Sequence, residues 1–244
     1  MKKEYRSLPE LAREQILCML EDHRLGPGDA VSHRMLADEL GMSTLSISSA
    51  FKTLEADGLI VTRNRSGSNI AVITPAAVWD LIQYRLAIEL HGARLACYSA
   101  TDKELTALAA LAPAADGIGV HSELERVEAD DRFHHALRQC AHTPSLLFPE
   151  NYLRIFRLKL DMCAGLQIRP ELLEDISRFT AHGHALIAEI AATRSAEQLA
   201  ETLEFHICGL IGLPQLEELR RNSGKHLRRM DSFLSAQNDK TIRS

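Results

Sequence analysis

The stretch SHRMLADELGMSTLSISSAFKTLEADGLIVTRNRSGSNIAV, residues 32–72, decides the fold of the N-terminal part of this chain. Ser32 and Ser43 each precede a run with helical periodicity, and a serine hydroxyl at that position caps the free amides of a first helical turn. Gly41 stands between the two runs, where a glycine ends a helix without steric cost. The pattern therefore predicts two short helices that meet at a tight turn.

The flanking residues extend this pair into a larger unit. Residues 8–25 have the periodicity of an amphipathic helix, and the segment GPGD after them ends it. Residues 59–63 and 69–74 are apolar and rich in β-branched side chains, with a polar, glycine-containing connection between them, which predicts a β-hairpin. This is the element order of a winged helix-turn-helix, a fold that commonly binds DNA, although a three-helix bundle capped by a hairpin has the same order.

Composition limits the classes of protein to consider. The chain has 244 residues, 45% of them hydrophobic and 25% charged, which is ordinary for a folded protein and argues against disorder. Its net charge of −5 argues against coating nucleic acid by bulk electrostatics and leaves room for a small DNA-reading module. The five cysteines form no C-x-x-C pair, and there is no signal peptide or membrane-spanning run. We expect a cytoplasmic protein without a membrane partner.

From residue 75 onward the sequence carries almost no strand signal. We therefore predict a winged helix-turn-helix domain at residues 1–74 and an all-helical domain at residues 75–244, so that the fold class is mainly α. Long amphipathic runs joined by short loops are typical of an antiparallel helical bundle. The predicted helices of this domain cover residues 77–100, 102–112, 122–142, 145–165, 171–193, 196–212 and 213–236.

The run DDRFHHAL places a carboxylate and an imidazole, Asp130 and His134, one helical turn apart on an apolar helix face. His184 and His206 also lie on apolar faces of their predicted helices. A buried polar side chain needs a partner, and three imidazoles with one carboxylate suit a divalent transition metal such as Zn, Ni, Mn or Fe. The alternative for each histidine taken singly is an ordinary core or surface residue.

At this point the sequence resembles a known family. The segments MLADELGMS, LEADGLIVTRNRSGSNIAV and YRLAIELHGARLA are similar to those of the GntR family of bacterial transcription regulators, in the FadR branch whose helical effector domain is of the FCD type. The resemblance extends over nearly the whole chain. It implies a homodimer that binds a pseudo-palindromic operator in double-stranded DNA and changes that binding when a small carboxylate effector occupies the helical domain.

The resemblance also bears on the metal ligands. FCD domains with a metal site carry D-x-x-x-H on one helix and two histidines about two dozen positions apart on the last two helices. Asp130 and His134 match the first element, and His184 and His206 match the second. His182, two residues from His184, stays open as the ligand if the helix register is shifted by one turn.

One residue is a candidate for binding the effector. Arg85 matches a family position that commonly faces the cavity of the helical domain, so the resemblance implies that it balances the charge of the carboxylate. The alternative is a surface salt bridge between Arg85 and Glu89, one helical turn along.

The DNA-reading end departs from the family pattern. Relatives usually carry arginines in a stretch like S-R-x-x-V-R-E-A-L, whereas Thr44 and Ser48 stand at those positions here. The recognition helix therefore offers hydroxyl groups and lacks the guanidinium fork that reads guanine bidentately. We predict DNA contacts from the basic and hydroxyl side chains of this helix, the preceding helix and the wing: Arg34, Ser43, Thr44, Ser46, Ser48, Lys52, Arg63 and Arg65.

Two other functions deserve comparison with an effector-responsive regulator. A pure metal sensor, in which the ion itself is the signal, is favoured by cysteine ligands, and none of the five cysteines has a spacing that joins the site. A metal-dependent hydrolase needs a general base, and the chain has no H-E-x-x-H, G-x-S-x-G or phosphate-binding loop motif. We therefore predict that the protein is not an enzyme.

Overall fold

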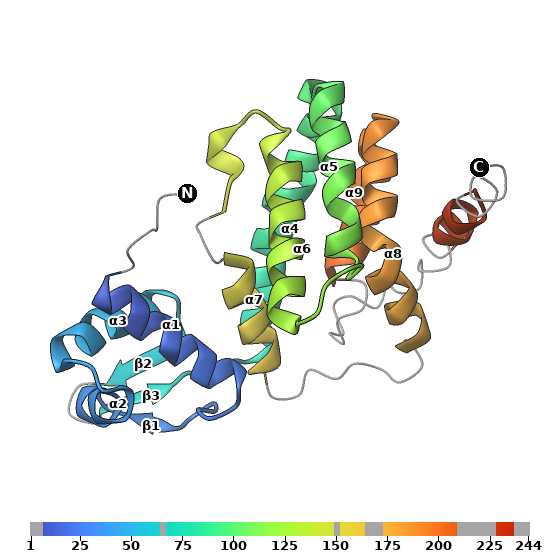
Figure 1. Ribbon diagram of the computed structural model, residues 1–244. Coiled ribbons are helices and arrows are strands. Elements are labelled where there is room, and N and C mark those ends of the chain that lie inside the picture. Colours follow the sequence, from blue (N-terminus) through green and yellow to red (C-terminus); the bar gives the residue numbers. More distant parts are fainter. Residues whose placement is uncertain (1–6, 64–66, 149–151, 164–172, 209–227, 237–244) are drawn as a thin grey trace. The chain divides into compact units, whose positions relative to one another are not determined.

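The structure is a computed structural model that describes residues 7–63, 67–148, 152–163, 173–208 and 228–236 (Figure 1). The chain divides into two compact units. One contains residues 1–78 together with 155–165, and the other contains residues 79–154 together with 166–244.

The first unit is built from the elements α1 (Leu8–Glu21), β1 (Ala30–Val31), α2 (His33–Leu40), α3 (Thr44–Ala56), β2 (Ile60–Arg63) and β3 (Gly67–Ile70). The caps expected from the sequence are present: the hydroxyl of Ser32 accepts from the amide of Met35, and that of Ser43 accepts from the amide of Ser46. Gly41 ends α2 in the left-handed conformation, with φ of 64°. The predicted winged helix-turn-helix is confirmed.

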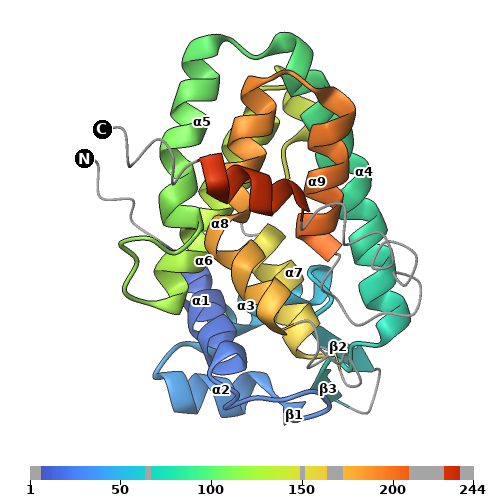
Figure 2. The ribbon, with the colours of Figure 1, turned by 90° about the vertical axis from the view of Figure 1, so that its right-hand side faces the viewer.

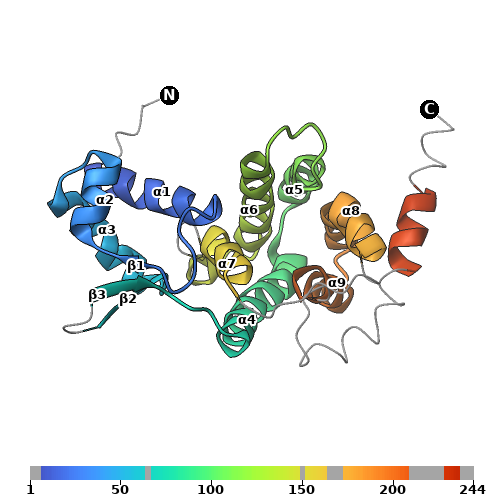
Figure 3. The ribbon, with the colours of Figure 1, turned by 90° about the horizontal axis from the view of Figure 1, so that it is seen from below.

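The sheet of this unit has three antiparallel strands in the order β1-β3-β2, where the sequence had predicted a two-stranded hairpin. In the wing, Val61 pairs with Asn69 and Arg63 pairs with Gly67. The second strand begins at Gly67 and ends at Ile70, rather than covering residues 69–74. Figures 1 and 3 show α1 and α3 on one side of the sheet.

Tertiary contacts complete the first unit. Ile16, Leu17, Phe51 and Leu54 are fully buried in its core, where α1 packs against α3. Residues 155–165, which lie far along the chain, also belong to this unit, and Cys163 in this segment forms a parallel bridge with Ile73.

The second unit is helical throughout its described part. Its elements are α4 (Pro75–Ser99), α5 (Asp102–Ala115), α6 (Glu123–Gln139), the 3-10 turn η1 (Pro144–Leu146), α7 (Tyr152–Asp161), α8 (Leu173–Ala192) and α9 (Ala196–Cys208), with α4 and α7 shared between the units. Helix α5 packs against α6 and α8, and α8 packs against α9 (Figure 3). The predicted helical bundle is confirmed.

Two helix ends differ from the sequence prediction for reasons that the hydrogen bonds show. The first helix ends at Glu21 instead of residue 25, because the chain turns there and the amides of Arg24 and Leu25 both donate to the carbonyl of Met19. Helix α5 continues past Pro113, since a proline in the last turn removes one bond while the amide of Asp116 still reaches the carbonyl of Ala112.

The predicted helix at 145–165 is wrong in its first part. Residues 144–146 form a 3-10 turn, and α7 begins at Tyr152. Residues 228–236 form a further helical segment, drawn in red in front of α8 and α9 in Figure 2. In the part of the chain that the structure describes, no helix combines the length and the apolar character that crossing a bilayer requires.

Candidate functional site

The helical unit brings four polar side chains together from three helices. Asp130 and His134 lie on α6, His184 on α8 and His206 on α9, and one ligand atom from each lies within 4.8 Å of all the others. The first three residues are buried, and His206 is half-buried. The Nε2 atoms of His134 and His206 are 3.4 Å apart, and Nε2 of His184 is 2.9 Å from Oδ1 of Asp130.

A buried carboxylate on α4 orients His134. Oε2 of Glu89 lies 2.6 Å from Nδ1 of His134. Burial acts to raise the pKa of Glu89, but Arg85, His134 and Arg138 outweigh it, so that the pKa is lowered and the carboxylate is ionised. An ionised carboxylate can only accept, so Nδ1 of His134 carries the proton. Its Nε2 therefore presents a lone pair to the cluster.

A second carboxylate orients His184. Asp116, the residue that caps the C-terminal end of α5, places Oδ1 2.8 Å from Nδ1 of His184 and also accepts from the backbone amides of His184 and Ala185. The same ring faces Asp130 through its other nitrogen. Burial acts to lower the pKa of His184, but hydrogen bonds and charge from Asp116 and Asp130 raise it to about 9. Between two carboxylates, this imidazole therefore holds a proton on each nitrogen.

The donor set fits a divalent transition metal. A cation between Nε2 of His184 and Asp130 replaces the proton that otherwise separates these two acceptors. Burial, and then the neighbouring His184 and His134, hold the pKa of His206 well below its ordinary value, so its imidazole is a neutral ligand. Zinc and similar ions bind imidazole nitrogen at about 2.0–2.1 Å, and ligand atoms spread over a few ångströms converge on such an ion with small side-chain movements.

Three other histidines of this unit lie outside the cluster. His182 is half-buried and is not a member of the cluster, so the fold brings in His184 of the two. His135 and His142 are exposed, and Nε2 of His142 lies 2.9 Å from Oε1 of Glu104.

Arg85 lies beside the cluster in a buried ion pair. Its Nε donates to Oε1 of Glu89 at 2.6 Å, and the two side chains are 6% and 1% exposed. The salt bridge named as an alternative is therefore present, but it lies in the interior. Glu89 thus joins Arg85 and His134 through its two oxygens.

Sequence reasoning missed three members of this network. Glu89 was not predicted to be a partner of His134, although its position one turn along α4 places it on the same face as Arg85. Arg138 lies one turn beyond His134 on α6, and this spacing was visible in the sequence. For Asp116 there was no such signal, since only the packing of α5 against α8 brings it to His184.

Most of the candidate DNA-binding side chains that the structure describes lie at the surface of the first unit. Arg34, Thr44, Lys52 and Arg63 are exposed, and Arg34 keeps 90% of its side-chain surface accessible. Ser43 is exposed and caps α3, while Ser48 is half-buried. Arg65 lies outside the described residues.

Ser46 faces inward. It is 6% exposed, and its hydroxyl lies 2.8 Å from that of Ser43, within the cap of α3. The sequence pattern included it because it stands in the first turn of the recognition helix, but its position in the cap leaves it without an exposed face. We therefore leave Ser46 out of the proposed DNA-binding surface.

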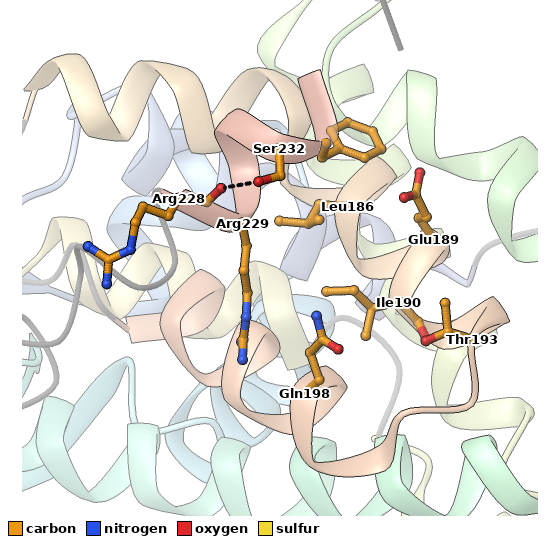
Figure 4. A pocket seen from close by; sticks show the side chains of 9 residues that line it. Leu186, Glu189, Ile190, Thr193, Gln198, Arg228, Arg229 and Ser232 are labelled. Atoms are coloured by element: carbon orange, nitrogen blue, oxygen red, sulfur yellow. Dashed lines mark hydrogen bonds between the residues drawn. The ribbon is translucent and has the colours of Figure 1, made fainter. Parts of the chain in front are cut away.

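A separate pocket of about 430 Å³ lies between α8, α9 and the helical segment 228–236 (Figure 4). Its walls are apolar at Leu186, Ile190 and Phe233, and Arg229 at its edge bonds to Glu201 and Thr202. The pocket shares no lining residue with the histidine cluster.

Comparison with known families accounts for both units. Residues 9–70 match the model described as bacterial regulatory proteins, gntR family, and residues 80–209 match the FCD domain.

Curated relatives are regulators of transcription. The chain is 28% identical over 129 residues to the Nta operon transcriptional regulator of Aminobacter aminovorans, covering 53% of this chain and 61% of that protein. It is 25% identical over 200 residues to the Glc operon transcriptional activator of Escherichia coli K12, covering 73% and 79%. The matched segments span about three fifths of the length of the Nta regulator and of the HTH-type regulator YdhC of Bacillus subtilis.

Solved structures share the fold. The structure of E. coli McbR/YncC aligns with a TM-score of 0.59 at 16% identity, covering 83% of this chain and 94% of that one. A GntR regulator from Rhodococcus sp. RHA1 aligns over the same shares with a TM-score of 0.56 at 17% identity.

Proposed function

Because the chain belongs to the GntR family of bacterial transcriptional regulators and carries an FCD effector domain, we propose that a metal-bound organic acid controls its binding to operator DNA. In this proposal the protein acts in the cytoplasm as a homodimer. The convergence of Asp130, His134, His184 and His206, each supplying one ligand atom, is the observation that carries it.

The DNA-binding part of the proposal rests on the exposed side chains of α2, α3 and the wing. Arg34 and Lys52 offer cations to phosphates, and Thr44 and Ser48 offer hydroxyl groups to phosphates or base edges. Arg63 at the end of β2 extends this surface onto the wing. A two-fold symmetric operator requires a two-fold symmetric protein, which is why the proposal includes a homodimer.

The effector part rests on charge. A divalent metal held by three neutral imidazoles and the carboxylate of Asp130 leaves the site near +1, which suits an anion. When bound, the metal supplies a Lewis-acidic centre for a carboxylate or hydroxyl oxygen. Glu89 and Asp116 hold His134 and His184 in the ring orientation that this role needs. Arg85 lies beside the cluster and is the candidate to balance a carboxylate.

One titration tests the effector proposal. Protein purified without chelator or nickel resin is stripped, reloaded with Zn, Ni, Mn or Fe(II), and mixed with an operator fragment selected from genomic DNA. We expect metal loading to leave operator binding in place and an added hydroxy acid to change the operator Kd. A change on metal alone, with no further effect of any acid, would identify a metal sensor instead.

Footprinting and light scattering test the DNA-binding part. We expect two half-sites related by a dyad, about one helical turn apart, and a dimer at micromolar concentration. A strict monomer with and without metal, or failure to bind any genomic fragment at moderate salt, contradicts it.

A further inference from the structure

A second arginine of the helical unit is buried without a hydrogen bond. Arg138 on α6 is 4% exposed, and its Nε and Nη1 atoms have no hydrogen-bond partner among the described residues. Its nearest acceptor, Oε1 of Glu89, is 3.6 Å from Nη1, beyond hydrogen-bond range, and already receives Nε of Arg85 at 2.6 Å. Arg138 is therefore a buried cation whose charge faces Glu89 but whose Nε and Nη1 donors make no hydrogen bond to a described residue.

Burying a guanidinium without hydrogen bonds is unfavourable in free energy unless a further acceptor binds its N–H groups. A guanidinium carries five N–H donors, and leaving them unpaired in the interior costs more than leaving neutral groups unpaired. The face of the group is covered, because its central carbon lies 4.3 Å from the centre of the Phe148 ring, which in turn stacks on Tyr152. Packing against a ring satisfies the face of a guanidinium and leaves its N–H edge for an acceptor.

The position of Arg138 relates it to the metal cluster. Asp130, His134 and Arg138 follow one another at four-residue intervals on α6 and therefore share a face of the helix. Each interval advances about 6 Å along the helix axis. Glu89 links the two side chains, since its Oε2 lies 2.6 Å from Nδ1 of His134 and its Oε1 lies 3.6 Å from Nη1 of Arg138.

We propose that Arg138 is an anion subsite that selects a short dicarboxylate as the effector, with one carboxylate at the metal cluster and the other at the N–H edge of Arg138. This inference rests on the proposed function of the cluster. The spacing of about 6 Å along α6 between the residues that would hold its two ends suits a chain of roughly four to six carbons with an acid group at each end. Arg85 and Arg138 both face Oε1 of Glu89, so the second carboxylate of the effector would lie near two cations.

The test compares two probes that differ in one group. Malate and 2-hydroxybutyrate have the same carbon chain and the same hydroxy-acid end for the metal, but malate has a carboxylate where the other has a methyl group. Binding of each to metal-loaded full-length protein is measured by calorimetry. We expect malate to bind about 10- to 100-fold more tightly, which is the range for a hydrogen bond to a buried charge.

Variants then assign the difference to Arg138. Arg138→Met should remove the preference for malate while leaving the Kd for 2-hydroxybutyrate and the metal content unchanged, and Arg138→Lys should restore part of it. Arg132→Met is the matched control, since Arg132 lies on the same helix, is 57% exposed and pairs with Glu128 at the surface. That variant should keep the preference.

The outcomes separate this inference from the function on which it rests. If 2-hydroxybutyrate binds and malate binds no better, the effector function stands and the dicarboxylate subsite is refuted. Equal loss of both acids in Arg138→Met and Arg138→Lys, with metal retained, would show a structural role and also refute it. If neither acid nor any longer homologue binds metal-loaded protein, the proposed effector function itself fails.

Discussion

The two units of the molecule hold their candidate functional side chains in opposite environments. In the winged unit, Arg34 keeps 90% of its side-chain surface exposed and its nearest carboxylate, on Asp38, is 4.0 Å away. In the helical unit, the His134 side chain has no exposed surface and lies between Glu89 and the other cluster residues.

The difference has a consequence for how each unit tolerates change. An exposed side chain with few contacts contributes little to the free energy of unfolding, so it can be exchanged at the cost of binding alone. A buried polar group is held by partners, and its removal leaves those partners unsatisfied. We therefore expect substitutions to separate binding from stability in the winged unit and to couple them in the helical unit.

The largest effect should come from removing two ligands of the cluster. His184→Ala combined with His206→Ala should lose most of the bound metal, as measured by elemental analysis. It should also abolish the stabilisation by metal, which appears as a rise in Tm of the unsubstituted protein. That stabilisation is about 2.7 kcal/mol when free metal is 100 times its Kd. His135→Ala and His142→Ala alter exposed residues and serve as controls that retain the metal. Full metal retention in the double variant contradicts the site.

A carboxylate that does not touch the metal should have the next largest effect. Asp116→Asn leaves all four ligands in place but weakens the acceptor that orients His184. We expect metal affinity, measured by competition with a chelator, to fall about 10- to 100-fold. Glu128→Gln on exposed α6 surface is the control. An unchanged metal Kd in Asp116→Asn would break the proposed link between buried partners and binding.

The winged unit should behave in the opposite way. Lys52→Ala and Arg34→Ala should each weaken operator binding and reduce the slope of log K against log salt concentration by about one. The free energy of unfolding should change by less than about 0.5 kcal/mol, because both side chains are exposed. Mobility-shift titrations at several salt concentrations and thermal unfolding check the two halves of the expectation. A large loss of stability would contradict the comparison.

The smallest effect tests whether burial of a side chain, rather than its place in the helical unit, couples its substitution to metal binding. Glu104 lies on the surface of the helical unit, where the backbone amide of Thr101 and the side chain of His142 lower its pKa to about 2. A lowered folded-state pKa stabilises the fold above the unfolded value near 4.5, and this stabilisation is lost as the pH falls toward 2.

Glu104→Gln should therefore reduce stability slightly at neutral pH and leave it nearly unchanged at pH 2. Acid unfolding followed by circular dichroism, with the unsubstituted protein alongside, measures the difference. Metal content should not change. A loss of metal in this variant would show that surface and site are coupled in the helical unit.

Much of the fold could be predicted because its signals are local. Ser32, Gly41 and Ser43 act on backbone groups within a few residues, so the turn between α2 and α3 was readable in the sequence. Strand β1 could not be predicted from the sequence, because two residues show no periodicity. Ala30 and Val31 become a strand only by pairing with β3. The sequence prediction ended α5 at residue 112, because a proline usually ends a helix. Pro113 lies in the last turn, where it removes only one backbone hydrogen bond.

For the candidate site, the spacing of Asp130 and His134 placed both residues on one face of α6 before any tertiary information was considered. The same local rule applies to Arg85 and Glu89 on α4. A helical period is a property of the backbone, so a four-residue interval gives a shared face in any helix. Local sequence patterns thus predicted the helix caps, the wing, the helical bundle and the shared helix faces within α4 and within α6.

Tertiary packing alone chose between the remaining possibilities. The local pattern favoured His184 but left His182 open, and His184 belongs to the cluster because α8 packs so that Asp116 and Asp130 contact its ring. Arg138 left without a hydrogen bond is likewise visible only in three dimensions. The physical reason is that helix periodicity acts over a few residues, whereas the pairing of a buried charge depends on side chains that the fold brings from distant positions.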